Sequence, residues 1–272
     1  VMGILNITPD SFYAGSRVHD ASDILFRAGQ MITEGAAILD IGGQSTRPGS
    51  EPVGVEEELQ RVIPAIEIVR KEFPRQLISV DTYYARVAAE AVAAGASIVN
   101  DVSAGAMDDE LISTVASLRV PYVLMHMKGH PQTMQMNPEY ENVTREVFDS
   151  LQQQLPILSS AGIADIIVDP GFGFGKTIAH NFTLLGELHL LAQLEKPVLV
   201  GISRKSTIYK TLGITAAEAL NGTTVLHTIA LLNGASILRV HDVREAVQAI
   251  RLVKACTDKK QLTELLFTLP HG

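Results

Sequence analysis

The sequence predicts an α/β protein folded as a single (β/α)8 barrel, the TIM-barrel fold, with its active site at the C-terminal ends of the strands. Three observations lead to this fold class. Short apolar runs alternate strictly with longer amphipathic stretches, which indicates a parallel sheet covered by helices. Eight such units fit into 272 residues, close to the usual length of about 250 residues for this barrel. Most of the apolar runs end in polar residues or glycine, as barrel strands do when they deliver side chains to a site.

The predicted strands are continuous apolar runs, as expected for parallel strands that are buried on both faces. In chain order they cover 1–7, 36–41, 76–80, 97–101, 120–125, 166–168, 197–202 and 235–240. No linker separates them, so we expect one domain over residues 1–272. A doubly wound open sheet is the structural alternative.

The stretches between the strands carry the apolar spacing of amphipathic helices. In chain order they cover 21–33, 56–73, 84–94, 109–117, about 142–160, 179–192, 216–232 and 242–254. The second helix begins with Glu56, Glu57 and Glu58, which suit the positive end of a helix dipole. Segments 8–20 and 44–54 are rich in glycine, proline and polar residues and are predicted to be loops.

Composition and charge narrow the class of protein. Apolar residues make up 46% and charged residues 19%, which indicates a globular chain, and the net charge of -8 argues against a nucleic-acid partner. No apolar run reaches the roughly 18 residues of a membrane span, and no signal-peptide pattern is present. The single cysteine, Cys256, excludes a disulfide framework and fits a reducing compartment, so we expect a cytoplasmic location. Val1 already lies inside an apolar run, so we expect a short native segment before it.

The stretch IIVDPGFGFGK at 166–176 combines a buried strand with a glycine-rich loop. It is not a phosphate-binding P-loop, because Pro170 stands where that motif requires its first glycine. It is not a dinucleotide fingerprint either, because its glycines are spaced two and two. The glycines would let the backbone approach a flat ligand, and Phe172 and Phe174 could stack on it.

Polar and other distinctive side chains collect where the predicted strands end. In order they are Asn6, Asp40, Asp81, Asn100, Met125, Asp169, Lys205, Arg239 and His241. Asp81, Asn100 and Asp169 could receive N–H donors from a flat heterocycle such as a guanine-like or pterin ring, and Lys205 could donate to its carbonyl. Buried acids without partners would be costly, so we expect a ligand or a cation to satisfy them.

Arg239 and His241 alternate on one strand and therefore face the same side. Together they indicate an anion pocket, most simply for phosphate. The alternative is an Arg239 paired to Asp242 beside a surface histidine. A zinc site is disfavoured, because the first strand has no HxH pair and the chain has no HExxH motif.

At these residues the sequence resembles the dihydropteroate synthases, the folate-pathway enzymes that sulfonamides target. The matching segments are GILNITPDSF, DIGGQSTRPG, SVDT, VND, DPGFGFGK, GISRKS and RVHDV, beginning at Gly3, Asp40, Ser79, Val99, Asp169, Gly201 and Arg239. The resemblance implies a homodimeric TIM barrel that joins 6-hydroxymethyl-7,8-dihydropterin diphosphate to 4-aminobenzoate and releases diphosphate with the help of Mg²⁺.

The resemblance also implies roles for single residues. Asn6 would help to hold Mg²⁺. The pterin would contact Asp81, Asn100, Met125, Asp169, Phe174, Gly201 and Lys205. The diphosphate would contact Asn6, Arg239 and His241. The 4-aminobenzoate would contact Phe12, Thr46, Arg47, Pro48, Phe174, Lys205 and Ser206. The catalytic set would be Asp81, Lys205, Arg239 and His241.

Two positions depart from the family pattern. Gln44 stands where the family usually has glutamate, and Ala14 replaces a loop acid, which leaves Asp10 as the remaining acid of that loop. We expect a dissociative substitution, because the electron-rich ring can delocalise a cation that Asp81 stabilises and an aromatic amine needs no strong base. The alternatives are a methyltetrahydrofolate methyltransferase of the same barrel family and a non-catalytic pterin-binding homologue.

Overall fold

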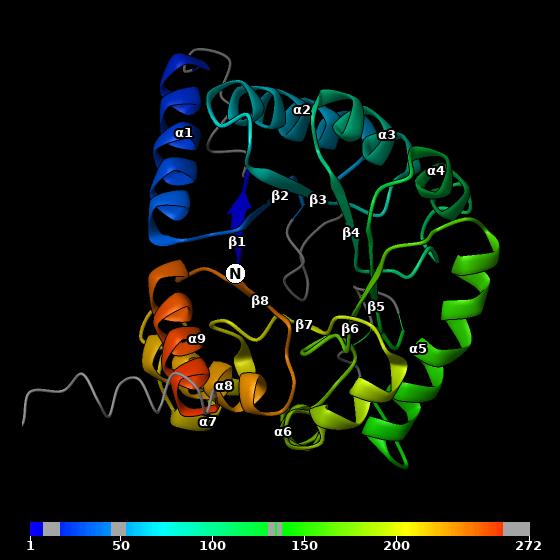
Figure 1. Ribbon diagram of the computed structural model, residues 1–272, viewed down its shortest axis with the longest axis vertical. Coiled ribbons are helices and arrows are strands. Elements are labelled where there is room, and N and C mark those ends of the chain that lie inside the picture. The colour runs from blue at the N-terminus through cyan, green and yellow to red at the C-terminus, as the bar shows by residue number, and fades with distance from the viewer. Residues whose placement is uncertain (8–16, 45–52, 130–133, 135–137, 258–272) are drawn as a thin grey trace, which may run out of the picture.

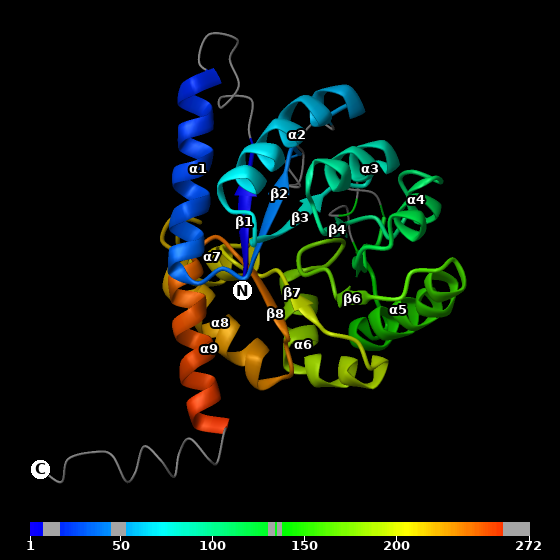
Figure 2. The ribbon, with the colours of Figure 1, turned by 45° about the horizontal axis from the view of Figure 1, so that its top comes forward.

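The computed structural model is a (β/α)8 barrel, as the sequence predicts, and not the open doubly wound sheet. It describes residues 1–7, 17–44, 53–129, 134 and 138–257. Within them, eight parallel strands follow one another in the order β6-β5-β4-β3-β2-β1-β8-β7. A parallel bridge between Val168 and Val198 joins the two ends of this sheet. Figures 1 and 2 show the helices arranged around the strands.

The ends of the observed strands lie within two residues of the predicted ends. They are β1 (Met2–Asn6), β2 (Ile38–Gly42), β3 (Leu77–Asp81), β4 (Ile98–Asp101), β5 (Tyr122–Met125), β6 (Ile166–Asp169), β7 (Leu199–Val200) and β8 (Ile237–Val240). The seventh is much shorter than the predicted 197–202. Val198 still takes part in the sheet, because its carbonyl accepts the Ser236 and Ile237 amides at 2.8 and 3.0 Å.

Helices connect the strands and form the outer layer. They are α1 (Arg17–Glu34), α2 (Val55–Glu72), α3 (Ala85–Ala94), α4 (Leu111–Leu118), α5 (Val143–Ser160), α6 (Ile178–Gly186), the 3-10 helix η2 (Leu188–Leu194), α7 (Ser206–Leu212), α8 (Leu220–Leu232) and α9 (Val243–Thr257). In the part of the chain that the structure describes, none of these helices has the length and apolar character needed to cross a membrane.

Four helical predictions need correction. The helix expected from 21 begins at Arg17, so the end of the predicted loop 8–20 belongs to α1. The single helix expected at 179–192 is two, because the chain leaves the α-helical path at Glu187 (φ -103°, ψ 12°), directly after Gly186. The sequence prediction missed α7, a seven-residue helix that ends at Gly213. The helix expected from 216 begins only at Leu220. The Glu218 carboxylate accepts the Thr215 amide and hydroxyl at 2.9 and 2.8 Å, so the preceding residues form a turn.

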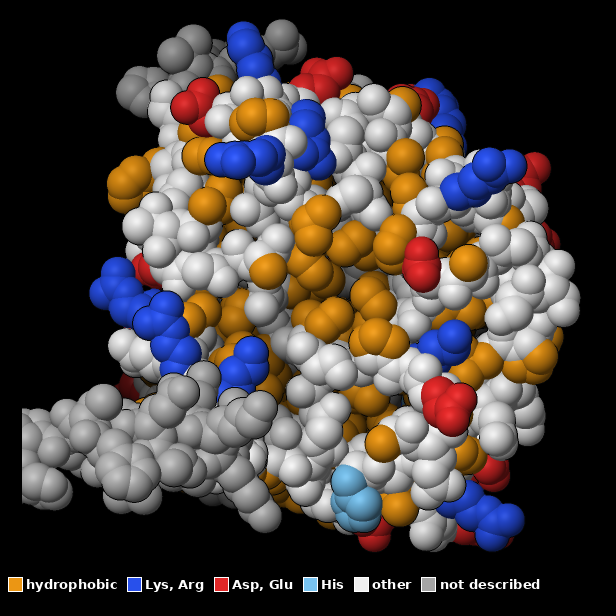
Figure 3. Space-filling model, viewed as in Figure 1, with side chains coloured by type: hydrophobic (Ala, Val, Ile, Leu, Met, Phe, Trp, Pro, Cys, Tyr) orange, Lys and Arg blue, Asp and Glu red, His pale blue; other side chains and the backbone are white. Residues whose placement is uncertain are grey.

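The inside of the barrel is apolar at one end and polar at the other. At the N-terminal ends of the strands, an apolar cluster closes the barrel with Met2, Ile38, Ile98, Val123 and Leu199. Figure 3 shows hydrophobic side chains gathered at the centre of this face, the one on which the N-terminus lies in Figure 1. Further along the strands the buried residues include Asp40, Ser79, Asp81, Asn100 and Asp169. The polar end is therefore the C-terminal one, where barrels of this kind carry their sites.

Candidate functional site

A buried ion cluster lies at the centre of the polar end. Arg239 of β8 donates from Nε to Asp40 Oδ2 of β2 at 2.6 Å and from Nη2 to Asp81 Oδ2 of β3 at 2.5 Å. Asn100 of β4 donates from Nδ2 to the same Asp40 oxygen at 3.1 Å. Four strands are tied together by these bonds. The alternative pairing of Arg239 with Asp242 is wrong, since both oxygens of Asp242 accept from Arg204 at 2.8 Å.

The surroundings of this cluster bring the pKa of one of its carboxyl groups close to neutral pH. Burial raises the pKa of Asp81 to about 7, the charge of Arg239 opposes this, and the nearby acids, Asp40 foremost, add to it. Two polar atoms beside it, Asp40 Oδ1 and Ser79 Oγ, are buried and have no hydrogen-bond partner within the described residues. A buried carboxylate oxygen and a buried hydroxyl without partners can bond to polar groups of a ligand.

A second group of polar atoms forms around the glycine loop, residues 171–175, which follows β6. Asp169 Oδ1 accepts the Gly171 amide at 2.7 Å, and Lys205 Nζ donates to the Phe172 carbonyl. The same Nζ lies 4.7 Å from the centre of the Phe174 ring, a cation–π contact. Burial lowers the pKa of Lys205 to about 8 and raises the pKa of Asp169.

Gly201 keeps the space between these two charged groups open. A Cβ atom at this position would lie 4.0 Å from both Asp169 Oδ2 and Lys205 Nζ, so a larger side chain would enter the space that they face. An apolar wall adjoins them, formed by Met125 and Phe174 together with Tyr83, Val102 and Met134. An apolar wall therefore stands beside hydrogen-bonding groups of both kinds, an arrangement that suits a flat heterocycle.

The remaining predicted residues lie at the rim or outside the described chain. Asn6 ends β1, Ser206 begins α7, and His241 follows β8 with its Nδ1 3.1 Å from Ser203 Oγ. Four predicted aminobenzoate residues, Phe12, Thr46, Arg47 and Pro48, lie outside the described residues, as do Asp10 and Ala14. Gln44 is described: its amide donates to Glu58, and its oxygen accepts the Tyr83 hydroxyl at 2.8 Å.

Sequence reasoning missed two parts of this end of the barrel. Asp40 was named as a strand-end acid but not as the centre of the ion cluster, and its only sequence signal is its place in a buried strand. Lys176, which ends the glycine-rich stretch, is 2% exposed and lies 2.9 Å from His126 Nδ1. A lysine that follows a buried strand and a glycine loop is a sequence signal by which Lys176 could have been identified.

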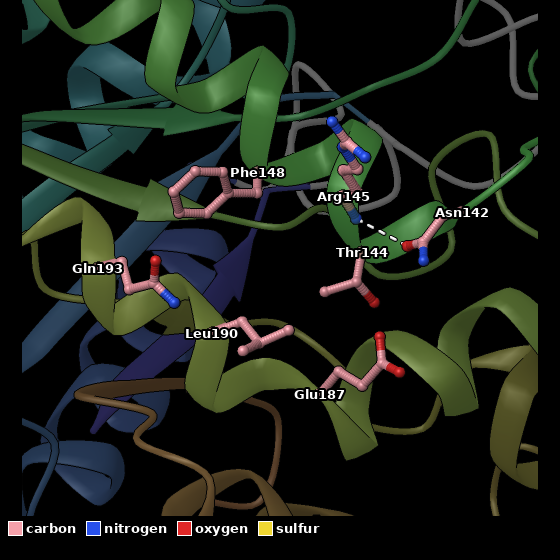
Figure 4. A pocket seen from close by; sticks show the side chains of 7 residues that line it. All are labelled: Asn142, Thr144, Arg145, Phe148, Glu187, Leu190 and Gln193. Atoms are coloured by element: carbon pink, nitrogen blue, oxygen red, sulfur yellow. Dashed lines mark hydrogen bonds between the residues drawn. The ribbon is translucent and has the colours of Figure 1, made fainter.

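A cavity of about 270 Å³ lies between the start of α5 and η2 and is lined by none of the predicted site residues (Figure 4). Its lining residues are Asn142, Thr144, Arg145, Phe148, Glu187, Leu190 and Gln193. The figure shows the Thr144 side chain directed toward Glu187, while the Asn142 side chain accepts the Arg145 amide. This cavity belongs to the outer layer of the barrel and takes no part in the site at the strand ends.

Comparison with known proteins identifies relatives of this chain. Residues 2–241 match the family described as "Pterin binding enzyme". A dihydropteroate synthase of Escherichia coli K12 is 44% identical over 263 residues, which are 96% of this chain and 93% of that protein.

Solved structures agree with this comparison. The Yersinia pestis dihydropteroate synthase in complex with a sulfonamide drug superposes with a TM-score of 0.88 at 40% identity, over 94% of this chain and 93% of that one. The Xanthomonas albilineans enzyme with 4-aminobenzoic acid gives a TM-score of 0.87 at 42% identity, over 94% and 92%.

Proposed function

The chain belongs to the pterin binding enzyme family, as a transferase of the dihydropteroate synthase type, and we propose that its own barrel mouth carries out each part of that reaction. The reaction joins 6-hydroxymethyl-7,8-dihydropterin diphosphate to 4-aminobenzoate and gives 7,8-dihydropteroate and diphosphate. The observation that carries the assignment of residues is the arrangement of Asp169 and Lys205 beside the Met125–Phe174 wall, with Asp81 and Asn100 at its polar side.

The pterin ring binds beside this wall. Asp81, Asn100 and Asp169 accept or exchange hydrogen bonds with the nitrogen edge of the ring, and Lys205 donates to its carbonyl. Met125, Phe174 and Gly201 bound the faces of the ring and leave room only for a flat group. The buried Asp40 Oδ1 and Ser79 Oγ, which have no hydrogen-bond partner among the described residues, support a polar ligand at this place.

The diphosphate binds at the rim, beside Asn6, Arg239 and His241. Arg239 is held between Asp40 and Asp81, and its charge acts at the inner edge of this rim. Asn6 offers an amide oxygen of the kind that Mg²⁺ prefers, and such an ion usually takes one or two protein ligands and completes its shell with substrate phosphates and water. When bound, Mg²⁺ neutralises charge on the leaving diphosphate.

Carbon–oxygen bond breaking precedes attack by the amine in this proposal. Asp81, once ionised, lies where it stabilises positive charge on the pterin and its methylene group. The aromatic amine of 4-aminobenzoate attacks without a strong base, since it is uncharged at neutral pH. Lys205 and Ser206 border its site, and Phe12, Thr46, Arg47 and Pro48 complete it.

The wider assignments belong to the same proposal. The chain is one catalytic domain over residues 1–272, acts in the cytoplasm and is a target of sulfonamides, which occupy the aminobenzoate site. The single unpaired cysteine, Cys256, supports a reducing compartment. A homodimer is proposed because α8 presents exposed apolar side chains, Val225, Ile229 and Leu232, on one face.

The direct test is product formation. Purified protein is incubated with the dihydropterin diphosphate, 4-aminobenzoate and Mg²⁺, and 7,8-dihydropteroate and diphosphate are quantified together. We expect equal amounts of both products and competitive inhibition by a sulfonamide against 4-aminobenzoate. Pterin binding without product would point to the non-catalytic homologue, and methyl transfer from methyltetrahydrofolate would point to the other barrel enzyme.

A further inference from the structure

Lys176 is a buried lysine that forms no ion pair within the described chain. It is 2% exposed, and its Nζ donates to the carbonyl oxygens of Gly171 at 3.0 Å and Phe174 at 3.1 Å. It also lies 2.9 Å from His126 Nδ1 and, in a longer contact, 3.5 Å from the His126 carbonyl oxygen. A lysine amine has three donors at most, so these contacts use its full capacity. Burying an amine is costly unless hydrogen bonds replace those it made with water, and here the glycine loop and His126 supply them.

The glycine loop supplies those contacts through an unusual backbone path. Gly171, Gly173 and Gly175 have φ values of 69°, 81° and 61°, in the left-handed region. A Cβ at Gly171 would lie 1.9 Å from the His126 carbonyl oxygen, and one at Gly175 would lie 2.3 Å from that of Lys128. The loop is thus pressed against the backbone that follows β5. Two of its carbonyl groups turn toward one point, and Lys176 Nζ occupies that point.

The same loop carries groups of the proposed pterin site. The Phe172 carbonyl accepts from Lys205 Nζ, the Phe174 ring lies under that amine, and the Gly171 amide holds Asp169 Oδ1. We propose that Lys176, together with His126, is a positioning residue that holds the glycine loop so that Lys205 and Asp169 keep the geometry needed to bind the pterin. The inference rests on the proposed function, because the pterin is the ligand whose binding it controls.

The protonation states of Lys176 and His126 let them support the glycine loop on both sides of neutral pH. Burial lowers the pKa of His126 to about 3, so its imidazole is neutral and has one nitrogen free to accept. Burial also lowers the pKa of Lys176 to about 7, an effect that Asp169 opposes and that Lys205 and Lys128 reinforce. A neutral amine still has two N–H donors for the two carbonyls and a lone pair for a His126 N–H. The loop therefore keeps its support on both sides of neutral pH.

The first test measures the loop without any ligand. Lys176→Met removes the amine and keeps an unbranched apolar side chain. Lys71→Met is the control, since Lys71 is exposed near the end of α2, which packs on α1, α3, β2 and β3. We expect amide hydrogen exchange over 171–175 to accelerate about tenfold or more in Lys176→Met and to stay unchanged in the control.

The second test measures pterin affinity by calorimetry with a pterin that carries no diphosphate. We expect Lys176→Met to weaken binding about tenfold or more, with kcat at saturating substrate changed much less, and Lys71→Met to bind as the wild type does. A residue important only for folding would lower the melting temperature and leave the affinity of the folded protein unchanged. That result would overturn the proposal.

If Lys176→Met does not fold, substitutions of His126, which contacts Lys176, test the proposal instead. His126→Asn retains an acceptor near the Nδ1 position, whereas His126→Leu removes it. We expect His126→Leu to loosen the loop and weaken pterin binding, and His126→Asn to restore most of both. Equal pterin affinity in the two His126 variants overturns the positioning role. Failure of the wild type to bind pterin contradicts the proposed function instead, so the two failures are distinguishable.

Discussion

At the scale of single residues, Asp169 has a different task at each of its carboxylate oxygens. Oδ1 accepts the Gly171 amide at 2.7 Å, while Oδ2 is the oxygen that faces the open space beside Gly201. The first contact supports the glycine loop and the second is available to a ligand. Replacing the carboxylate with an amide can therefore separate the support of the glycine loop from the binding of a ligand, because an asparagine oxygen can keep the bond to the Gly171 amide.

We predict that Asp169→Asn weakens pterin binding by about 2 kcal/mol or more, because an amide N–H₂ replaces the acceptor that faces the ring. Calorimetry with a pterin that carries no diphosphate measures the loss. The melting temperature serves as the control and should change little, since the bond to Gly171 can persist. Unchanged affinity would remove Asp169 from the pterin site.

The pH dependence of binding follows from Asp81 and Lys205. The acceptor form of Asp81 is the ionised one, so affinity should rise as pH increases through its pKa of about 7. The charged form of Lys205 is the stronger hydrogen-bond donor, so affinity should fall as pH increases through its pKa of about 8. We predict a bell-shaped profile with its maximum between these values.

The measurement uses a pterin analogue that does not itself ionise between pH 5 and pH 9. Lys205→Met should bind more weakly at every pH, lose the alkaline limb and keep the acid limb. A flat profile in the wild type would mean that Asp81 and Lys205 do not titrate in contact with the ligand.

At the scale of elements, the sequence predicts what its periodicity encodes and misses what depends on packing. Seven of the eight strands agree with prediction because apolar runs ending in a polar residue are a local pattern. The short α7, with the sequence STIYKTL, has three β-branched residues and no helical signal strong enough to separate it from a loop. The break at Glu187 follows a glycine that an apolar pattern alone does not resolve.

The features of the candidate site also fall into two groups: those that a local sequence pattern predicts and those that depend on packing. Asp81, Asn100, Asp169 and Lys205 could be named because they stand at strand ends or directly after them. The bond from Arg239 to Asp40 joins residues 199 positions apart, and the one from Lys176 to His126 joins residues 50 apart. Such pairs depend on barrel closure and on the shape of the glycine loop, which no local pattern contains.

The glycine loop gives a prediction at this scale. Gly171→Ala should destabilise the protein by about 2–4 kcal/mol, because its Cβ would overlap the His126 carbonyl and its φ of 69° is unfavourable for alanine. Gly186→Ala is the matched control: no atom lies within 4 Å of its Cβ position, and it ends an α-helix. We expect the control to stay within about 1 kcal/mol of the wild type. Chemical denaturation measures the free energy of unfolding of both variants. Equal midpoints would show that the loop backbone accommodates a Cβ atom at position 171 without loss of stability.

At the scale of the whole molecule, the barrel separates stability from function along its axis. The apolar cluster around Met2, Val123 and Leu199 closes the N-terminal end, while the charged residues gather at the other. The described residues of the proposed pterin site lie at the C-terminal ends of the strands and in the glycine loop, whereas α8 lies in the outer layer. Association through the outer helices can therefore change without disturbing the pterin site.

The outer helices give the last prediction. Val225, Ile229 and Leu232 are 50%, 37% and 60% exposed and follow the four-and-three spacing that places them on one face of α8. Leu212, at the end of the neighbouring α7, is 56% exposed. Exposed apolar side chains grouped in this way are stabilised when a second copy covers them, and a two-fold axis would bring the same face of each copy together.

We predict that Val225→Lys combined with Ile229→Lys converts a dimer into monomers, because four lysines would meet in one interface. Phe26→Lys is the control: Phe26 is 69% exposed on α1, a helix that Figure 1 shows apart from α8, so the dimer should persist. Sedimentation velocity gives the mass of each protein, and calorimetry should find pterin affinity within about twofold of the wild type in the monomeric variant. A wild type that sediments as a monomer, or a double variant that stays dimeric, would remove this face of α8 from the proposed interface.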